Sequence, residues 1–175
     1  MMGSGKSTIG RLLSEATGWP YIDNDELVRR SRGATARQIL AERGEDRLRD
    51  AESDALMLGI ETPPPAVVGV AAGTILDPAN RERLRTGGVV VWLRTDAAIL
   101  ESRAVGAEHR PWVDSGMRTW ISDAAAERES LYASVADIVI DTGARPPEAA
   151  AAELLDRLRD IPACRKALGS DELPE

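Results

Sequence analysis

The first residues that could do chemistry stand at the start of the chain, where positions 3–8 read Gly-Ser-Gly-Lys-Ser-Thr. This is the second half of the phosphate-binding pattern G-x-x-x-x-G-K-[ST]. Its glycines let backbone N–H groups face the phosphates, and a following helix adds its positive dipole. The pattern assigns Lys6 to the β- and γ-phosphates and the Ser7 hydroxyl to Mg²⁺. The alternative is a glycine-rich turn with a solvated lysine. The candidate nucleotide-binding residues here are Gly3, Ser4, Gly5, Lys6, Ser7 and Thr8.

Two carboxylates follow the next apolar segment. Asp23 and Asp25 flank Asn24, directly after Tyr21-Ile22. Ligands of open α/β sheets bind beyond the carboxyl ends of the strands, so we expect both aspartates at one crevice. One of them can hold Mg²⁺ through water, and the other can accept a proton or a hydrogen bond from a substrate hydroxyl. The alternative for Asp25 is a capping role at the next helix.

Three arginines, at positions 49, 110 and 128, are further candidates, although isolated helical arginines are usually solvated. Arg110 lies in the polar segment 106–116, which has the composition of a lid. An arginine delivered by lid closure can neutralise charge on a transferring phosphoryl group. We interpret His109 as a surface residue and Cys164, the one cysteine, as an incidental thiol.

The elements that must position these residues alternate along the chain. Apolar spacing predicts a helix over 7–17 that ends at Gly18, and further helices over 25–32, 35–42, 46–60, 78–85, 96–105, 117–132 and 147–159. Short apolar runs predict strands over 19–23, 66–70, 89–93 and 136–141. Continuous apolar strands between helices indicate a parallel sheet covered on both faces, which is a three-layer α/β fold.

Length and composition limit the class of protein. A chain of 175 residues, with 43% hydrophobic and 29% charged residues, predicts one globular domain. We place that domain at residues 1–162, with a polar tail over 163–175. The net charge of −7 argues against a nucleic-acid surface, and no apolar run approaches the ~18 residues that span a bilayer. We expect a cytoplasmic protein, a monomer, with small-molecule partners.

Taken together, these motifs resemble the shikimate kinase family of P-loop small-molecule kinases, collinearly from residue 2 to about residue 158. Its motifs match the loop at 2–11, Asp23-Asn24-Asp25, the G-E-D-R-L-R segment at 44–49, Arg110-Pro111, and E-R at 127–128 with L-Y at 131–132 and A-D at 136–137. The resemblance implies a P-loop fold with strand order 2-3-1-4-5 and a substrate-binding segment at about 24–60. It implies Asp23 at Mg²⁺ and Asp25 at the substrate hydroxyls. It also implies Arg49 and Arg128 at the substrate carboxylate, Arg103 beside adenine, and a place in aromatic amino acid biosynthesis.

The pocket wall departs from the family pattern. Where the family has three glycines after its third strand, this chain has Ala71-Ala72-Gly73, and leucines stand at 40 and 48 in place of phenylalanines. We expected the two methyl groups to intrude, and positive φ angles to be disfavoured, where the backbone approaches substrate. Ala72 and Gly73 remain candidate substrate contacts.

The first strand of the family's sheet has no counterpart in this sequence. Losing about five buried apolar side chains, at ~1.5–3 kcal/mol each, would cost as much as a typical domain's stability. We therefore expect that Met1 is a misplaced start and that a short apolar strand ending in glycine lies upstream.

The sequence thus predicts transfer of the ATP γ-phosphoryl group to a hydroxyl of a carboxylate-bearing cyclic polyol, with Mg²⁺. Lys6 and Arg110 would stabilise the charge, and Asp25 would orient the hydroxyl. Shikimate, converted to shikimate 3-phosphate, is the expected substrate. The alternatives are another polyol acid such as gluconate or a cyclitol, a nucleotide-binding homologue without turnover, and an inactive remnant.

Overall fold

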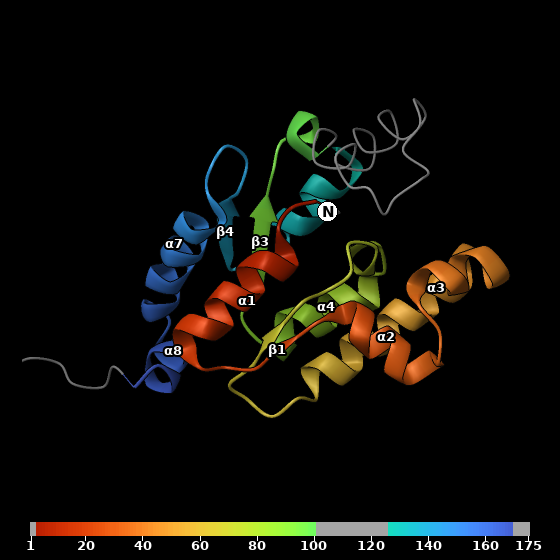
Figure 1. The fold of residues 1–175 in the computed structure, drawn as a ribbon, viewed down its shortest axis with the longest axis horizontal. Coiled ribbons are helices and arrows are strands. Elements are labelled where there is room, and N and C mark those ends of the chain that lie inside the picture. Colours follow the sequence, from red (N-terminus) through yellow and green to blue (C-terminus); the bar gives the residue numbers. More distant parts are fainter. Residues whose placement is uncertain (1–2, 101–125, 170–175) are drawn as a thin grey trace, which may run out of the picture.

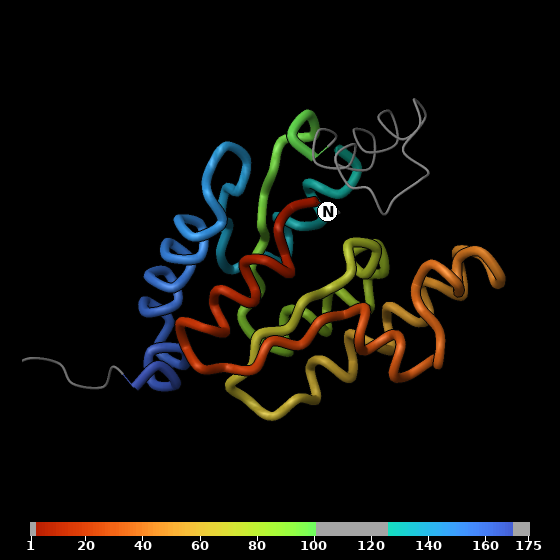
Figure 2. Tube along the Cα trace, in the orientation of Figure 1, coloured from red at the N-terminus to blue at the C-terminus, as the bar shows by residue number. Residues whose placement is uncertain are grey.

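Two pairs of parallel strands form the centre of the fold. The structure is a computed structural model that describes residues 3–100 and 126–169. Strand β1 (Tyr21–Ile22) pairs with β2 (Val67–Val68), and β3 (Val91–Arg94) pairs with β4 (Ile138–Asp141). The traces of β1 and β2 run together, apart from those of β3 and β4 (Figure 2). Both pairs are parallel, as the apolar runs predicted.

Helices cover both faces of these strands (Figure 1). On one face, α1 (Lys6–Thr17) packs beside α7 (Pro147–Arg159), and Ile9, Leu13 and Leu154 form a core with Ile140 of β4. On the other face lie α3 (Ala36–Ile60) and α4 (Pro78–Gly87), joined to β2 through the 3₁₀ turn η1 (Thr74–Leu76). This is the predicted three-layer arrangement.

A second apolar core joins α2 (Asn24–Arg32) to α3. Leu27, Val28, Ile39 and Leu48 are buried in it. Leu48 therefore supports the packing of two helices, whereas Leu40 is 48% exposed. The two leucines that replace the family's phenylalanines thus lie in different surroundings.

The ends of these helices follow from their sequences. The Asp23 side chain accepts a hydrogen bond from the backbone N–H of Asp25 and caps α2. Thr35 and Gln38 form a capping box at the start of α3. Gly44 interrupts α3 with φ 83° and ψ 177°, a backbone conformation that favours glycine. The break falls between the two helices that the sequence predicted there.

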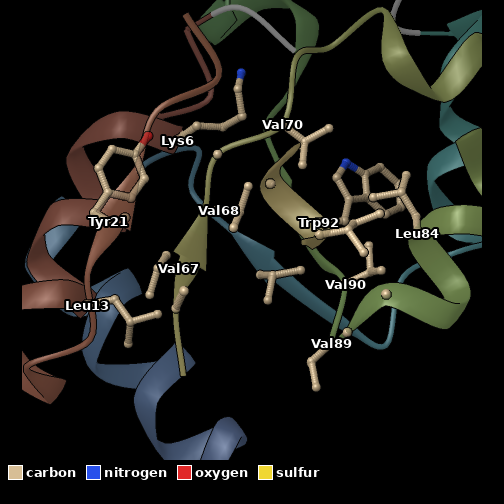
Figure 3. A pocket seen from close by; sticks show the side chains of 18 of the residues that line it. Lys6, Leu13, Tyr21, Val67, Val68, Val70, Leu84, Val89, Val90 and Trp92 are labelled. Atoms are coloured by element: carbon tan, nitrogen blue, oxygen red, sulfur yellow. The ribbon is translucent and has the colours of Figure 1, made fainter. Parts of the chain in front are cut away.

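A cavity of about 470 Å³ lies between β2 and β3; we call it the central opening. Figure 3 shows Val67, Val68 and Val70 on one side of it and Val89, Val90 and Trp92 on the other. Within the described residues, no strand pairs with the edges of β2 and β3 that face this opening. The order β1-β2, opening, β3-β4 matches the family order 2-3-1-4-5 with its first strand left out. The upstream strand itself stays a prediction.

The C-terminal boundary expected from the sequence is wrong. Residues 162–167 form α8 (Pro162–Ala167), which packs against α7, and Cys164 lies against the apolar core. The expected polar tail from 163 therefore begins inside a helix. Proline at the first helical position starts that helix, a signal that the polar composition obscured.

The strands are also shorter than their apolar runs. The run 66–70 forms strand only at Val67–Val68, and 89–93 begins its strand at Val91. Parts of the helices expected at 96–105 and 117–132 fall within the described chain, where residues 97–100 and 126–133 are helical. No helix among the described residues is long and apolar enough to cross a membrane.

Candidate active site

The phosphate loop has the backbone geometry that its glycines predict. Gly3 and Gly5 adopt positive φ angles of 82° and 89°, and Gly5 caps the N-terminus of α1. A residue distant in the sequence anchors the Ser4 backbone, because the Thr142 hydroxyl donates a hydrogen bond to the Ser4 carbonyl at 3.1 Å. Thr142 directly follows β4, so the carboxyl end of that strand supports the loop. Lys6 lies at the end of the central opening near Val70 (Figure 3).

The predicted Mg²⁺ ligands lie together. The Ser7 hydroxyl donates to a carboxylate oxygen of Asp23 at 3.0 Å, and the Tyr21 hydroxyl donates to the same oxygen at 3.1 Å. A hydroxyl and a carboxylate are oxygen donors of the kind that Mg²⁺ takes together with water and phosphate oxygens. The residues therefore fit such an ion. Asp23 also caps α2, so the capping role considered for Asp25 belongs to its neighbour.

Asp25, Arg49 and Arg128 gather around a residue to which the sequence gave no role, Glu52. Its buried carboxylate accepts a hydrogen bond from the Arg49 guanidinium at 2.6 Å and interacts electrostatically with Arg128 and Asp25. Arg128 is only 6% exposed. We call Asp25, Arg49, Glu52 and Arg128 the arginine cluster. The structure thus brings together all three predicted substrate-binding side chains.

The charges of the cluster are adjusted by burial and by one another. Burial raises the pKa of the Glu52 carboxyl above its ordinary value, and Arg49 and Arg128 offset this only in part. Burial acts to lower the pKa of Arg49, but its contacts with Glu52 and Glu45 outweigh that effect and raise it. The guanidinium therefore stays charged, as a carboxylate-binding group must.

The absence of a side chain at Gly73 makes room for the guanidinium of Arg49. A Cβ atom on Gly73 would stand 1.7 Å from a terminal nitrogen of Arg49, so the guanidinium lies directly against the backbone here. Its φ of −77° is open to any residue. No described residue other than glycine has a positive φ, so the strain that we expected at Ala71 and Ala72 is absent. The two alanines fit this backbone.

Tyr132 connects the loop after β2 to the helical residues 126–133. Its hydroxyl donates to the Ala72 carbonyl at 3.0 Å, and its ring stacks on Trp92 of β3 at 5.7 Å between centroids. Burial raises the pKa of Tyr132 to about 12, opposed in part by the nearby Arg128. Arg128 stands four residues earlier, on the same face of the helix. The tyrosine therefore fixes Ala72 relative to a candidate substrate arginine.

Helical spacing could have identified two of the residues that sequence reasoning missed. Glu52 follows Arg49 by three residues and Tyr132 follows Arg128 by four, which on a helix places each pair on one face. The anchoring of Ser4 by Thr142 has no such local signal, because 138 positions separate the two residues. The predicted nucleotide contacts Arg103 and Arg110, and the expected lid at 106–116, lie outside the described residues.

Comparisons with known proteins agree with this geometry. A sequence model of the shikimate kinase family matches residues 2–159. The chain is 35% identical over 158 residues to shikimate kinase of Moorella thermoacetica, covering 90% of each chain. It is 31% identical over 159 residues to shikimate kinase of Paramagnetospirillum magneticum, covering 90% of this chain and 80% of that one.

Solved structures give the same result. Shikimate kinase from Acinetobacter baumannii in complex with shikimate superposes with a TM-score of 0.84 and 29% identity, covering 92% of this chain and 90% of that one. Shikimate kinase from Aquifex aeolicus gives a TM-score of 0.75 with 26% identity, covering 91% and 92%. The predicted P-loop fold and the predicted resemblance are both confirmed. The chain belongs to the shikimate kinase family of small-molecule kinases.

Proposed function

We propose that this chain transfers the γ-phosphoryl group of ATP to a ring hydroxyl of shikimate, giving shikimate 3-phosphate and ADP. The observation that carries the proposal is the start of α2 at Asp23–Asp25. Asp23 contacts Ser7 of the phosphate loop, and two residues later Asp25 belongs to the arginine cluster. The first turn of one helix therefore joins a phosphate site to a site suited to a carboxylate-bearing polyol.

The arginine cluster supports an acid as the second substrate. Arg49 and Arg128 present two guanidinium groups beside the buried carboxylate of Glu52. Planar guanidinium groups bind carboxylates through paired hydrogen bonds, which suits an incoming acid. Shikimate offers a carboxylate at one end of its ring and hydroxyls at the other, which suits arginines on one side and Asp25 on the other.

The phosphoryl transfer follows from the same residues. The substrate oxygen forms a bond to the γ-phosphorus while the bond from that phosphorus to the β–γ bridging oxygen breaks, and ADP leaves. Asp25 orients the hydroxyl and accepts its proton, which passes on to solvent. Lys6 and the lid residue Arg110 stabilise the charge that spreads over the phosphoryl oxygens.

Ser7 and Asp23 would hold Mg²⁺, which neutralises phosphate charge when it is bound. Arg103 remains our proposal for the adenine contact. We also propose that the chain acts as a monomer on small molecules in the cytoplasm.

An ADP-release assay tests the proposal. We expect the purified chain with ATP and Mg²⁺ to release ADP when shikimate is added, and less when quinate or gluconate is added. If another acid is preferred, shikimate is not the substrate, and the proposal that the chain is a kinase still stands. ATP binding without stimulation by any acid would indicate a nucleotide-binding homologue, and no ATP binding would indicate an inactive remnant.

A further inference from the structure

The guanidinium of Arg49 already holds a carboxylate at each of its terminal nitrogens. One nitrogen donates to Glu52 at 2.6 Å, and the other donates to Glu45 at 2.6 Å. A substrate carboxylate that binds Arg49 through paired hydrogen bonds needs two neighbouring donors on one edge of the guanidinium. Every such edge includes a terminal nitrogen that already has a carboxylate partner, so the incoming acid competes with at least one of these two glutamates for the charge of Arg49.

The two glutamates differ in how firmly they are held. The Glu52 side chain is 11% exposed, interacts also with Arg128, and lies with the guanidinium against the Gly73 backbone. The Glu45 side chain is 66% exposed. Ion pairs with so exposed a partner contribute little free energy, whereas a buried carboxylate has few other partners. Glu45 is the one that an incoming acid can replace.

The backbone around Glu45 also permits the exchange. Glu45 directly follows the break in α3 at Gly44, so it begins the second helical section, four residues before Arg49. Its side chain reaches Arg49 from the solvent side of the cluster. Turning that side chain outward breaks one exposed ion pair and leaves the contact between Arg49 and Glu52 in place.

We propose that Glu45 occupies, on Arg49, the position that the substrate carboxylate takes, and that it competes with the substrate for this arginine. The inference rests on the proposed function and deepens it, because it makes Glu45 a determinant of affinity for the acid. Glu45 keeps Arg49 extended toward the site while no substrate is bound. An acid enters by exchanging its carboxylate for that of Glu45.

The variant Glu45→Gln tests this competition, because it removes the competing charge at nearly constant size. We expect the KM for shikimate to fall about two- to five-fold, the range that corresponds to an exposed ion pair. The KM for ATP and kcat should stay unchanged. The matched control is Asp46→Asn, which removes the same charge from the next, exposed residue.

Three outcomes would overturn the proposal. If the KM for shikimate stays constant or rises in E45Q, Glu45 supports the site rather than competing for it. If D46N lowers the KM equally, the effect is one of net charge alone. If the wild-type chain neither phosphorylates nor binds shikimate in calorimetry, the proposed function fails and this inference fails with it. In the first two cases the proposed function stands.

Discussion

The arginine cluster and the central opening share helix α3 but are built in different ways. Arg49 and Glu52 of α3 belong to the cluster, whereas Leu56, Gly59 and Ile60 of the same helix line the opening. In the cluster, Arg49 and Glu52 are one helical turn apart on α3, whereas Asp25 of α2 and Arg128 of the helical residues 126–133 come from other parts of the chain. In the opening, apolar side chains from two separate strand pairs face each other across about 470 Å³.

The difference teaches which part of the fold depends on distant residues. Helical neighbours three residues apart, such as Arg49 and Glu52, form the part of the polar site that the local sequence determines. A strand between β2 and β3 would be buried on both faces and would pair at both edges, so nothing local can replace it. The catalytic features and the centre of the sheet can therefore be perturbed separately.

The largest effect is expected from filling the central opening. A segment of five valine and leucine residues followed by glycine is fused ahead of Met1. Burying about five apolar side chains at ~1.5–3 kcal/mol each, against ~1–2 kcal/mol of ordering entropy per residue, leaves about 4 kcal/mol of stabilisation.

For a domain of this size that gain raises Tm by roughly 10 °C. Scanning calorimetry measures it. The matched control is a fused segment of the same length made of serine and aspartate. If both fusions melt at the same temperature, the opening does not accept a strand.

The second prediction is a change that lowers catalysis and leaves the stability of the fold nearly constant. Lys6→Met should lower kcat by about 10²–10³, because it removes a positive charge directed at the transferring phosphoryl group. Tm should change little, since Lys6 lies at the end of the opening and outside the apolar core. Lys166, the other lysine in the sequence, supplies the control Lys166→Met in α8. Equal activity of K6M and K166M would refute the role of Lys6 in transfer.

Sequence reasoning succeeded where the signal is local. Helix α7 was predicted at 147–159 and occupies Pro147–Arg159, because a proline start and a regular apolar face both lie within the segment. Asp25, Arg49 and Arg128 were selected from motifs, and the structure places them around Glu52; their roles at the substrate stay predictions.

It failed where distant neighbours decide the structure. The run 66–70 is apolar throughout, yet pairing with β1 fixes the strand at two residues, Val67 and Val68. Position 73 needs glycine because the Arg49 side chain, 24 positions earlier in the sequence, lies against its backbone. The support of Ser4 by Thr142 is likewise a long-range contact.

The third prediction tests whether the cluster acts on one substrate only. Arg49→Gln removes the net equivalent of one charge-assisted hydrogen bond to a carboxylate, worth about 1.5–3 kcal/mol, so the KM for shikimate should rise about 10- to 100-fold. The KM for ATP should stay constant. Arg47→Gln is the control, since Arg47 pairs with Asp50 on the exposed side of the same helix. A parallel rise in the KM for ATP would mean that the variant disturbs the phosphate loop as well.

The smallest effect is expected at Tyr132, which links the loop after β2 to the strand β3 and so touches both regions. Its pKa in the folded chain, about 12, lies above the ordinary 10.0, so the folded state holds the phenolic proton more tightly. The stabilising contribution of the Tyr132 proton is then fully present below pH 10. It falls as the pH rises toward 12, by about 1 kcal/mol between pH 10 and pH 11.

Tyr132→Phe should lower the free energy of unfolding by about 1 kcal/mol at neutral pH, because the bond to Ala72 is lost, and should remove this alkaline loss of stability. Urea unfolding from about pH 9 to about pH 11.5 measures the difference, and the titration of Tyr21 cancels because both chains retain it. An equally steep alkaline loss in wild type and Y132F would show that the Tyr132 phenol is not the group responsible.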